Sequence, residues 1–260
     1  MPRKVVHLPR VALGRVHRAF RIYLRKLRPA FVAQFKRLRR RLLAKQRAAD
    51  ILAVRYPTAT TSGYYHYVHQ TNDAYKINNW LVSEIEAILS IRPKSVLEVG
   101  CGNGRFLAAI KDRVERATGV DWAKSPILDE LGVSRHFELR DITRDELPEA
   151  DLVCSADVLE HIAPHLLQST LQRLHTAGRD QYHVIACYDD GHSHLSIMQP
   201  RAWLHAFRSV SQRYRMIDIR PRRDDHAQAI CVIATFEPSV SPSRHLGGKA
   251  TPELPLARAR

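Results

Sequence analysis

The sequence lacks the features that would place it inside a membrane or in a small disulfide-bonded scaffold. No run of apolar residues reaches the length of about 18 that a spanning helix needs, so no segment is expected to cross a bilayer. The chain has four cysteines, Cys101, Cys154, Cys187 and Cys231, and neighbours lie 33 to 53 residues apart, which suits neither a zinc cluster nor a compact disulfide framework. We therefore expect reduced thiols in a cytoplasmic protein.

Acidic residues are nearly absent from the first fifth of the chain. Residues 1–50 contain 16 Lys or Arg and the single acid Asp50, whereas residues 51–260 contain 25 bases and 25 acids, so the net charge of +15 belongs to this segment. Residues 1–49 also lack Ser and Thr, in which a mitochondrial transit peptide is rich, and no apolar core of a secretory signal forms among the arginines.

The apolar residues of this basic segment recur at steps of three and four, which predicts an amphipathic helix that Pro29 kinks or divides. They are Val16, Phe20, Leu24, Leu27, Phe31, Phe35, Leu38 and Leu42. We interpret residues 1–54 as a basic helical extension. Its continuous apolar seam favours contact of residues 1–50 with an anionic membrane surface, which would hold the protein peripherally at the inner face of the membrane. Binding to RNA phosphates, packing against a protein partner or the domain itself, and a solvated charged tail are the alternatives.

Residues 55–77 break this period and are rich in Tyr and His, so we predict an irregular, aromatic connector that acts as a lid over a ligand. A helix is expected from Asn78 to Ser90. Residues 237–260 are rich in Pro, Ser and Gly and are expected to be a disordered tail.

Between these segments, residues 78–236 alternate apolar runs typical of strands with helical stretches, as a mostly parallel sheet covered on both faces requires. The expected strands are 95–99, 117–120, 136–139, 152–156, 183–188, 214–219 and 228–236, of which the last two suit a hairpin, and the expected helices include 105–113 and 164–175. The fold class is therefore α/β with a Rossmann-like sheet.

Three glycines on alternate positions follow the first expected strand, in "LEVGCGNGRF" (residues 97–106). In an open parallel sheet this turn lines the ligand crevice. A dinucleotide fingerprint would require a third glycine where the chain has Arg105, and the carboxylate of Glu98 would repel a pyrophosphate. The pattern instead favours a ligand with a positive charge or an amino group.

With its flanking residues, this motif is similar to the first motif of the class I S-adenosylmethionine-dependent methyltransferases. The later motifs follow in order: "GVDWAKSPI" (119–127), "LRDITRDELP" (139–148) and "ADLVCSADVLEHI" (150–162). The resemblance covers residues 78–236 and implies a seven-stranded sheet, the last strand antiparallel, an enzyme, and S-adenosylmethionine as the cofactor.

The resemblance also implies a cofactor site. Glu98 would lie near the methionyl amino group, Asp121 would accept hydrogen bonds from the ribose hydroxyls, and Asp141 would face the adenine amino group. The complete set is Glu98, Gly100, Gly102, Gly104, Asp121, Trp122, Asp141, Ile142 and Asp157. Each of these residues also has a purely structural interpretation. The glycines would only form a tight turn, Asp121 would cap the helix that follows it, and Asp141 would belong to a capping turn.

The acceptor is expected over the ends of the fourth and fifth strands, beside "CYDDGHSHLSIMQPRAWLHAF" (187–207). A histidine of near-neutral pKa suits acceptance of a hydroxyl proton, and the candidates are, in order, His194, His192 and His161. No pair of candidate ligands here has a clear metal-binding spacing beyond H-x-H, so no metal site is expected.

A His-containing loop followed by P-R-x-W resembles methyltransferases of glycans and cell-surface polysaccharides. It implies a sugar hydroxyl of a glycan or lipid-linked saccharide as the acceptor. The signatures of adenine and cytosine methylation are absent after the fourth strand, which makes nucleic acid a less favoured partner. The alternatives are an RNA or small-molecule methyltransferase, and a non-catalytic adaptor that binds a membrane or a partner.

Overall fold

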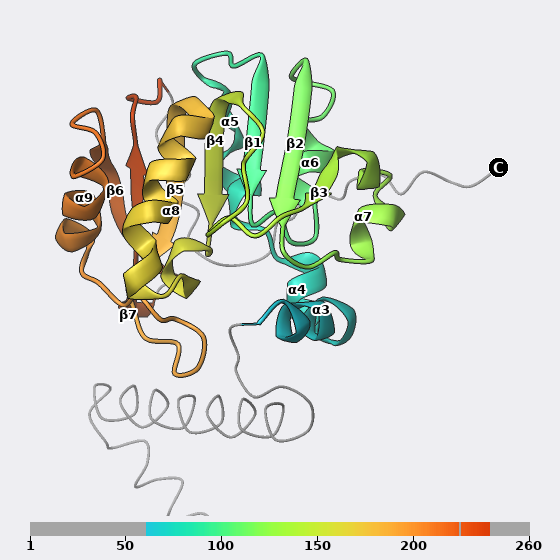
Figure 1. Ribbon diagram of the computed structural model, residues 1–260, viewed down its shortest axis with the longest axis horizontal. Coiled ribbons are helices and arrows are strands. Elements are labelled where there is room, and N and C mark those ends of the chain that lie inside the picture. The colour runs from blue at the N-terminus through green and yellow to red at the C-terminus, as the bar shows by residue number, and fades with distance from the viewer. Residues whose placement is uncertain (1–60, 224, 240–260) are drawn as a thin grey trace, which may run out of the picture. The chain divides into compact units, whose positions relative to one another are not determined.

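The structure, a computed structural model of the chain, describes residues 61–223 and 225–239. Its centre is one seven-stranded sheet of strand order β3-β2-β1-β4-β5-β7-β6 (Figure 1). The strands are β1 (Ser95–Val99), β2 (Arg116–Asp121), β3 (Phe137–Leu139), β4 (Ala150–Ala156), β5 (Gly178–Ala186), β6 (Arg215–Arg222) and β7 (Asp225–Ala234). Strand β7 runs antiparallel to both of its neighbours, and the pairs among β1 to β5 are parallel. The predicted sheet and its antiparallel last strand are confirmed.

Helices cover both faces of this sheet. They are α3 (Ser62–Thr71), α4 (Asp73–Ile77), α5 (Ile85–Leu89), α6 (Arg105–Ile110), α7 (Ile127–Glu130), α8 (Pro164–Ala177) and α9 (Pro200–Arg208), with 3-10 turns η1 (Trp80–Glu84), η2 (Ser134–His136) and η3 (Leu159–His161). Residues of α5 and α6 pack with one face of the sheet, and residues of α8 and α9 with the other, in two separate apolar clusters. The strands read as apolar runs because both faces are buried.

Residues 62–71 and 73–77 of the segment predicted as an irregular connector are helical, which corrects the prediction for them, whereas residues 55–60 lie outside the described part of the chain. Thr61 caps α3, its side chain accepting a hydrogen bond from the backbone N–H of Tyr64, and Asn72 caps α4 in the same way. One side of α3 is buried in a small cluster that also contains Ala123. The cap residues are visible in the sequence. The helical period is not, because the aromatic residues are ordered by tertiary packing and do not form a simple apolar stripe.

Strand β5 begins earlier than predicted, at Gly178 instead of His183. The polar Gln181 in this first part is buried and hydrogen-bonded: its side-chain amide donates to the carbonyls of Leu174 and Gly178, and its backbone N–H donates to the hydroxyl of Thr235. The helix expected from Asn78 to Ser90 is likewise two shorter elements, η1 and α5.

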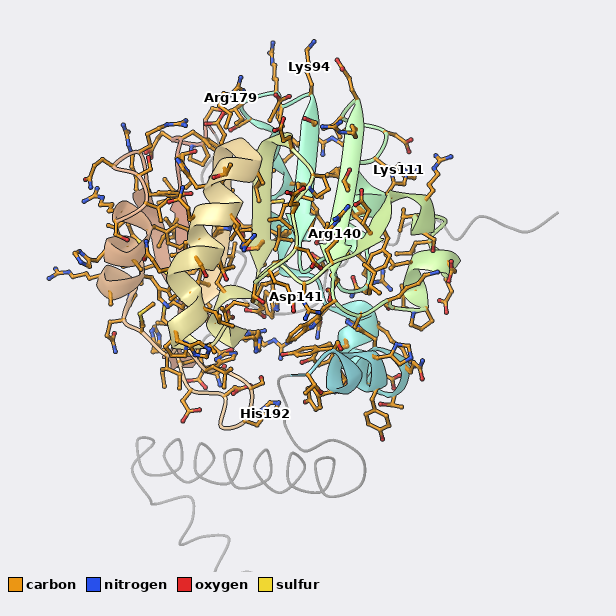
Figure 2. The ribbon with its side chains drawn as sticks, in the orientation of Figure 1. Lys94, Lys111, Arg140, Asp141, Arg179 and His192 are labelled. Atoms are coloured by element: carbon orange, nitrogen blue, oxygen red, sulfur yellow. The ribbon has the colours of Figure 1, made fainter. Side chains whose placement is uncertain are left out.

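The parallel strands β1, β2 and β4 end at the same edge of the sheet, and α3 and α4 lie beside that edge (Figure 1). Lys94 and Arg179 lie at the opposite end of the sheet from His192 (Figure 2). In the part of the chain that the structure describes, no helix has the length and apolar character needed to cross a bilayer. The predictions of a helical extension over residues 1–54 and of a disordered tail beyond residue 239 fall outside the described residues.

Candidate active site

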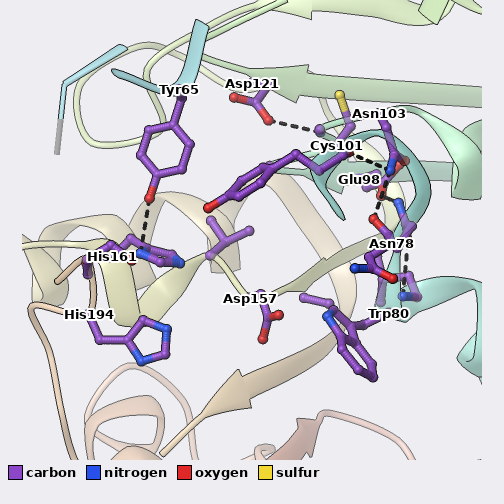
Figure 3. Close-up of a pocket in the computed structure, with 18 of the residues that line it drawn as sticks. Tyr65, Asn78, Trp80, Glu98, Cys101, Asn103, Asp121, Asp157, His161 and His194 are labelled. Carbon is purple, nitrogen blue, oxygen red and sulfur yellow. Dashed lines mark hydrogen bonds between the residues drawn. The ribbon is translucent and has the colours of Figure 1, made fainter. Parts of the chain in front are cut away.

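A cavity of 420 Å³ opens at the carboxyl edge of the sheet, lined by the turns that follow β1, β2, β3, β4 and β5 and by α3 and α4 (Figure 3). It brings together most of the residues predicted for the site: Glu98, Gly100, Gly102, Asp121, Trp122, Asp141, Ile142, Asp157, His161 and His194. Gly104 and His192 do not line it.

The turn after β1 needs glycines because its backbone is left-handed and because it lies close to neighbouring side chains. Gly100 has φ 68° and Gly102 φ 51°, a left-handed region that side chains disfavour. A Cβ atom on Gly100 would lie 2.3 Å from Cγ2 of Val158. Gly104 also has a positive φ, but a Cβ there would meet Leu128 in the core, so this glycine permits helix packing instead of facing the cavity as predicted.

Glu98 is buried at the floor of the cavity, with 1% of its surface exposed. Its Oε1 accepts a hydrogen bond from the side-chain amide of Asn79 at 3.1 Å, whereas Oε2 has no partner. Burial raises the pKa of this carboxyl well above its ordinary value. The empty oxygen can accept a hydrogen bond from a cation, and a cation would stabilise the ionised form.

Asp121 ends β2 and holds the glycine turn in place. Its carboxylate accepts hydrogen bonds from the backbone N–H of Gly102 at 2.9 Å and of Ala123 at 3.2 Å. Burial raises the pKa of Asp121, and the nearby His69 opposes that effect. Each oxygen keeps a further lone pair, so the structural cap and the predicted ribose contact are compatible roles.

The other two predicted acids have partners within the protein. Asp141 lines the cavity, and its Oδ1 accepts from the backbone N–H and the hydroxyl of Thr143, which is the capping turn left open above. Asp157 has φ 55° and forms a two-pronged ion pair with the guanidinium of Arg222. The Arg222 guanidinium also lies 4.4 Å from the ring centre of Trp80, so Asp157 anchors an arginine and an aromatic wall.

Two of the three predicted histidines meet at the far end of the cavity. The rings of His161 and His194 are 4.9 Å apart between centroids, in an edge-to-face arrangement. Burial, followed by the charge of His194, lowers the pKa of His161 to about 4, so its imidazole is neutral at physiological pH. His192, which does not line the cavity, instead pairs with Asp190 at 3.0 Å, and this contact raises the pKa of His192.

Helix α3 contributes residues that the sequence did not single out for the site. The hydroxyl of Tyr65 lies 3.1 Å from Nδ1 of His161, and its ring lies against Trp122. His69 lines the cavity with 3% exposure and an Nδ1 atom without a partner. The only sequence signal for these residues was the clustering of Tyr and His in residues 55–77, which led to the prediction of a lid.

These residues fit S-adenosylmethionine. Its ammonium matches the buried, unpartnered oxygen of Glu98, its ribose hydroxyls match the carboxylate of Asp121, and the bare backbone at Gly100 and Gly102 leaves room for close approach. The fit rests on the donors and acceptors of this site, not on its shape alone.

Comparison with known proteins agrees with this geometry. A family model described as a methyltransferase domain matches residues 67–224, more than half of the chain. A protein named ubiquinone biosynthesis O-methyltransferase from Pseudomonas entomophila is 35% identical over 95 residues, which are 33% of this chain and 41% of that protein. A protein of the same name from Stutzerimonas stutzeri is 31% identical over 97 residues, 34% of this chain and 42% of that protein. The chain thus spans less than half the length of these curated relatives.

Solved structures share the fold. The complex of DhpI with S-adenosylhomocysteine superposes with a TM-score of 0.52 at 14% identity, covering 69% of this chain and 96% of DhpI. The 1,6-didemethyltoxoflavin-N1-methyltransferase of Burkholderia thailandensis, solved with S-adenosylhomocysteine, superposes with a TM-score of 0.52 at 19% identity and covers 68% of this chain and 86% of that enzyme. At these identities the likeness establishes the architecture.

Proposed function

The chain belongs to the methyltransferase family whose domain model it matches, a family of S-adenosylmethionine-dependent enzymes, and we propose that it methylates a hydroxyl group of a small acceptor. The observation that carries this proposal is one cavity with a cofactor end at Glu98 and Asp121 and a histidine pair at its other end. When bound, S-adenosylmethionine supplies a methyl group that its sulfonium already activates.

At the cofactor end, the residues of this chain bind and orient. Glu98 would receive the amino group, Asp121 would bind the ribose, and the turn at Gly100 and Gly102 would lie against the methionyl portion. Trp122, Asp141 and Ile142, which also line the cavity, would hold the adenine. Glu98 and Asp121 are buried, which limits access of water to them and strengthens each charged hydrogen bond.

At the acceptor end, His161 and His194 would receive the hydroxyl group and draw away its proton as the methyl group is transferred. A neutral imidazole suits this task because one of its nitrogens keeps a lone pair, and the lowered pKa of His161 keeps that ring neutral. The hydroxyl of Tyr65 on α3 sits against His161 and limits the movement of its ring.

A sugar hydroxyl of a glycan or lipid-linked saccharide is the acceptor class that we propose first. Aromatic side chains, a residue type that can stack on sugar rings, line the cavity at Tyr75, Trp80 and Tyr188, and the guanidinium of Arg222 lies over the ring of Trp80. The curated relatives are named as O-methyltransferases, which supports oxygen over nitrogen as the methylated atom. A phenol is the second class, and it matches the ubiquinone pathway in the names of these relatives.

The test is a methyl-transfer assay with the intact chain, S-adenosylmethionine carrying a labelled methyl group, and a matched panel of sugar and phenol acceptors. We expect the labelled methyl group on an oxygen atom of an acceptor from one of the two panels. We expect S-adenosylhomocysteine to form in an amount equal to the transferred label. Label on neither panel, with S-adenosylhomocysteine bound tightly in calorimetry, would refute the O-methyltransferase and favour the adaptor. Label on RNA in a parallel reaction would favour the RNA enzyme instead.

Membrane attachment through residues 1–50 stays a prediction, because those residues lie outside the described part of the chain. It would place the proposed enzyme where lipid-linked saccharides are assembled.

A further inference from the structure

Three potential metal ligands converge behind the acceptor end of the cavity. Glu160 and His161 lie on η3, and His194 comes from the loop after β5. One ligand atom from each side chain lies within 4.8 Å of the other two, and the carboxylate of Glu160 is 4.0 Å from Nε2 of His194. The labelled His161 and His194 approach each other at one side of the cavity (Figure 3).

The loop that carries His194 is tied to η3 by the backbone. The carbonyl oxygen of Glu160 accepts hydrogen bonds from the backbone N–H of Leu195 at 2.7 Å and of Ser196 at 2.9 Å. The three side chains are therefore held together by main-chain contacts, which do not depend on the side chains themselves.

Both imidazoles are arranged as metal ligands. Nδ1 of His161 lies 3.0 Å from the carbonyl oxygen of Ser193, and Nδ1 of His194 lies 2.6 Å from that of Tyr188. Because a carbonyl oxygen can only accept, each Nδ1 carries a proton, and the hydroxyl oxygen of Tyr65 then accepts from the same N–H of His161 at 3.1 Å. In the neutral ring Nε2 keeps its lone pair. Backbone carbonyls commonly fix metal-binding histidines in this tautomer.

An independent observation comes from Glu160. This side chain is 0% exposed, its Oε1 accepts from the backbone N–H of Ala186, and its Oε2 has no hydrogen-bond partner. A buried carboxylate oxygen without a partner is costly unless a cation compensates it. Of the three residues, His161 and His194 line the cavity, so a ligand in the cavity can reach the group through them.

We infer that Glu160, His161 and His194 bind one divalent transition-metal ion, which contacts the acceptor hydroxyl from the wall of the cavity. Two imidazoles and one carboxylate form a ligand set of the kind used for catalytic zinc and related ions, with a position left for a substrate oxygen. Ligands at roughly 2.1 Å from a tetrahedral ion lie roughly 3.4 Å apart, so the side chains would draw together by about 1 Å.

This inference rests on the proposed function and makes it more specific. A cation at this position would lower the pKa of the hydroxyl it contacts, so the histidines would act on the acceptor through the ion and the proton would leave to water. The tautomers already present would then serve to bind the ion.

The experiment uses the intact chain, purified without a polyhistidine tag and freed of metal with a chelator. Zn²⁺ is titrated by calorimetry, and Co²⁺ is followed by its visible absorption, which reports nitrogen ligands and low coordination directly. The variants are Glu160→Gln and His194→Gln, which keep side-chain size. His165→Ala, an exposed histidine of α8, is the matched control.

We expect one ion per chain for the unaltered protein and the control, and roughly tenfold or greater weakening in each site variant. No binding by the unaltered protein, or equal binding by folded site variants, would overturn the inference. A Co²⁺ spectrum of the unaltered protein without nitrogen-ligand bands would also overturn it, even if the variants fail to fold.

A titration of S-adenosylhomocysteine separates this inference from the proposed function. Binding of the cofactor product without binding of metal overturns only the metal site. Binding of metal without binding of the cofactor product supports the metal site and refutes the proposed methyltransferase activity.

Discussion

Glu98→Gln is the substitution that tests the cofactor end most directly, because it changes charge with little change of shape. In the structure Oε1 is already bonded to Asn79, so one oxygen, Oε2, is free for the cofactor. The glutamine carbonyl can keep the bond to Asn79, and the amide NH₂ then faces the ammonium. We expect the variant to bind S-adenosylhomocysteine more weakly. It loses the charge-assisted hydrogen bond to the ammonium, and its amide NH₂ group, a donor, faces the ammonium, which is also a donor.

The magnitude follows from that single contact. A hydrogen bond to a charged group contributes about 1.5–3 kcal/mol, which corresponds to roughly 10–150-fold weaker binding of S-adenosylhomocysteine. The assay is isothermal titration calorimetry of S-adenosylhomocysteine into both proteins. Glu115→Gln is the control, since that carboxylate is 72% exposed and its neighbour Lys94 lies at the opposite end of the sheet (Figure 2).

Without ligand, Glu98→Gln should make the folded protein more stable at neutral pH. Burial raises the pKa of Glu98 above its model-compound value of 4.5, so the folded state holds a proton that the unfolded state releases. The free energy of unfolding therefore falls as pH rises from 4.5 toward the raised pKa of the folded state, and Glu98→Gln should remove this fall. Thermal melts from acid to neutral pH measure it. Unchanged ligand affinity, or a variant that melts much earlier at neutral pH, would refute the reasoning.

Four further predictions concern other parts of the protein. Asp121→Ala should weaken S-adenosylhomocysteine binding by roughly tenfold or more in calorimetry, because it removes the ribose acceptor and frees the Gly102 N–H; equal affinity would contradict the assignment. His194→Gln should lower the rate of methyl transfer by about 100-fold or more while leaving S-adenosylhomocysteine affinity nearly unchanged, and parallel loss of both would indicate a structural role. Tyr65→Phe should lower kcat/KM by roughly fivefold, the effect of one hydrogen bond of about 1 kcal/mol to His161, with no change as the opposing result. Removal of residues 1–50 should abolish co-sedimentation with anionic vesicles and spare cofactor binding; persistent sedimentation would exclude the extension as the anchor.

The sheet and the cofactor end were predictable because they depend on local sequence. Strand β1 was predicted with the bounds that the structure has, since an apolar run ends directly at the glycine turn. Glu98 and Asp121 follow from strand ends, because parallel strands bring their carboxyl ends to one edge. The enzyme class and cofactor predicted from these motifs agree with the family that the chain matches.

The acceptor end was less predictable because it depends on side chains that meet only in the fold. Glu160 stood in a motif that the sequence identified, yet nothing in its spacing shows that its carboxylate faces a histidine more than 30 residues away. The expectation of no metal site relied on sequence spacing, which does not show that side chains of a turn and a distant loop come together, and that expectation stays a prediction. His192, in the same loop, was ranked directly after His194, but it pairs with Asp190 and does not line the cavity, whereas His194 does.

Helix α3 links the two ends of the cavity, and this has a consequence for the order of binding. Its Tyr65 contacts His161 at the acceptor end and packs on Trp122 at the cofactor end, while His69 lies beside the glycine turn and near the charge of Asp121. A ligand that orders the glycine turn must therefore also fix α3, and with it the ring of His161. Cofactor binding would then complete the acceptor end, because ordering of α3 has already been achieved when the acceptor arrives. An acceptor should consequently bind more tightly to the protein saturated with S-adenosylhomocysteine than to the free protein, and by linkage the acceptor should tighten S-adenosylhomocysteine by the same factor.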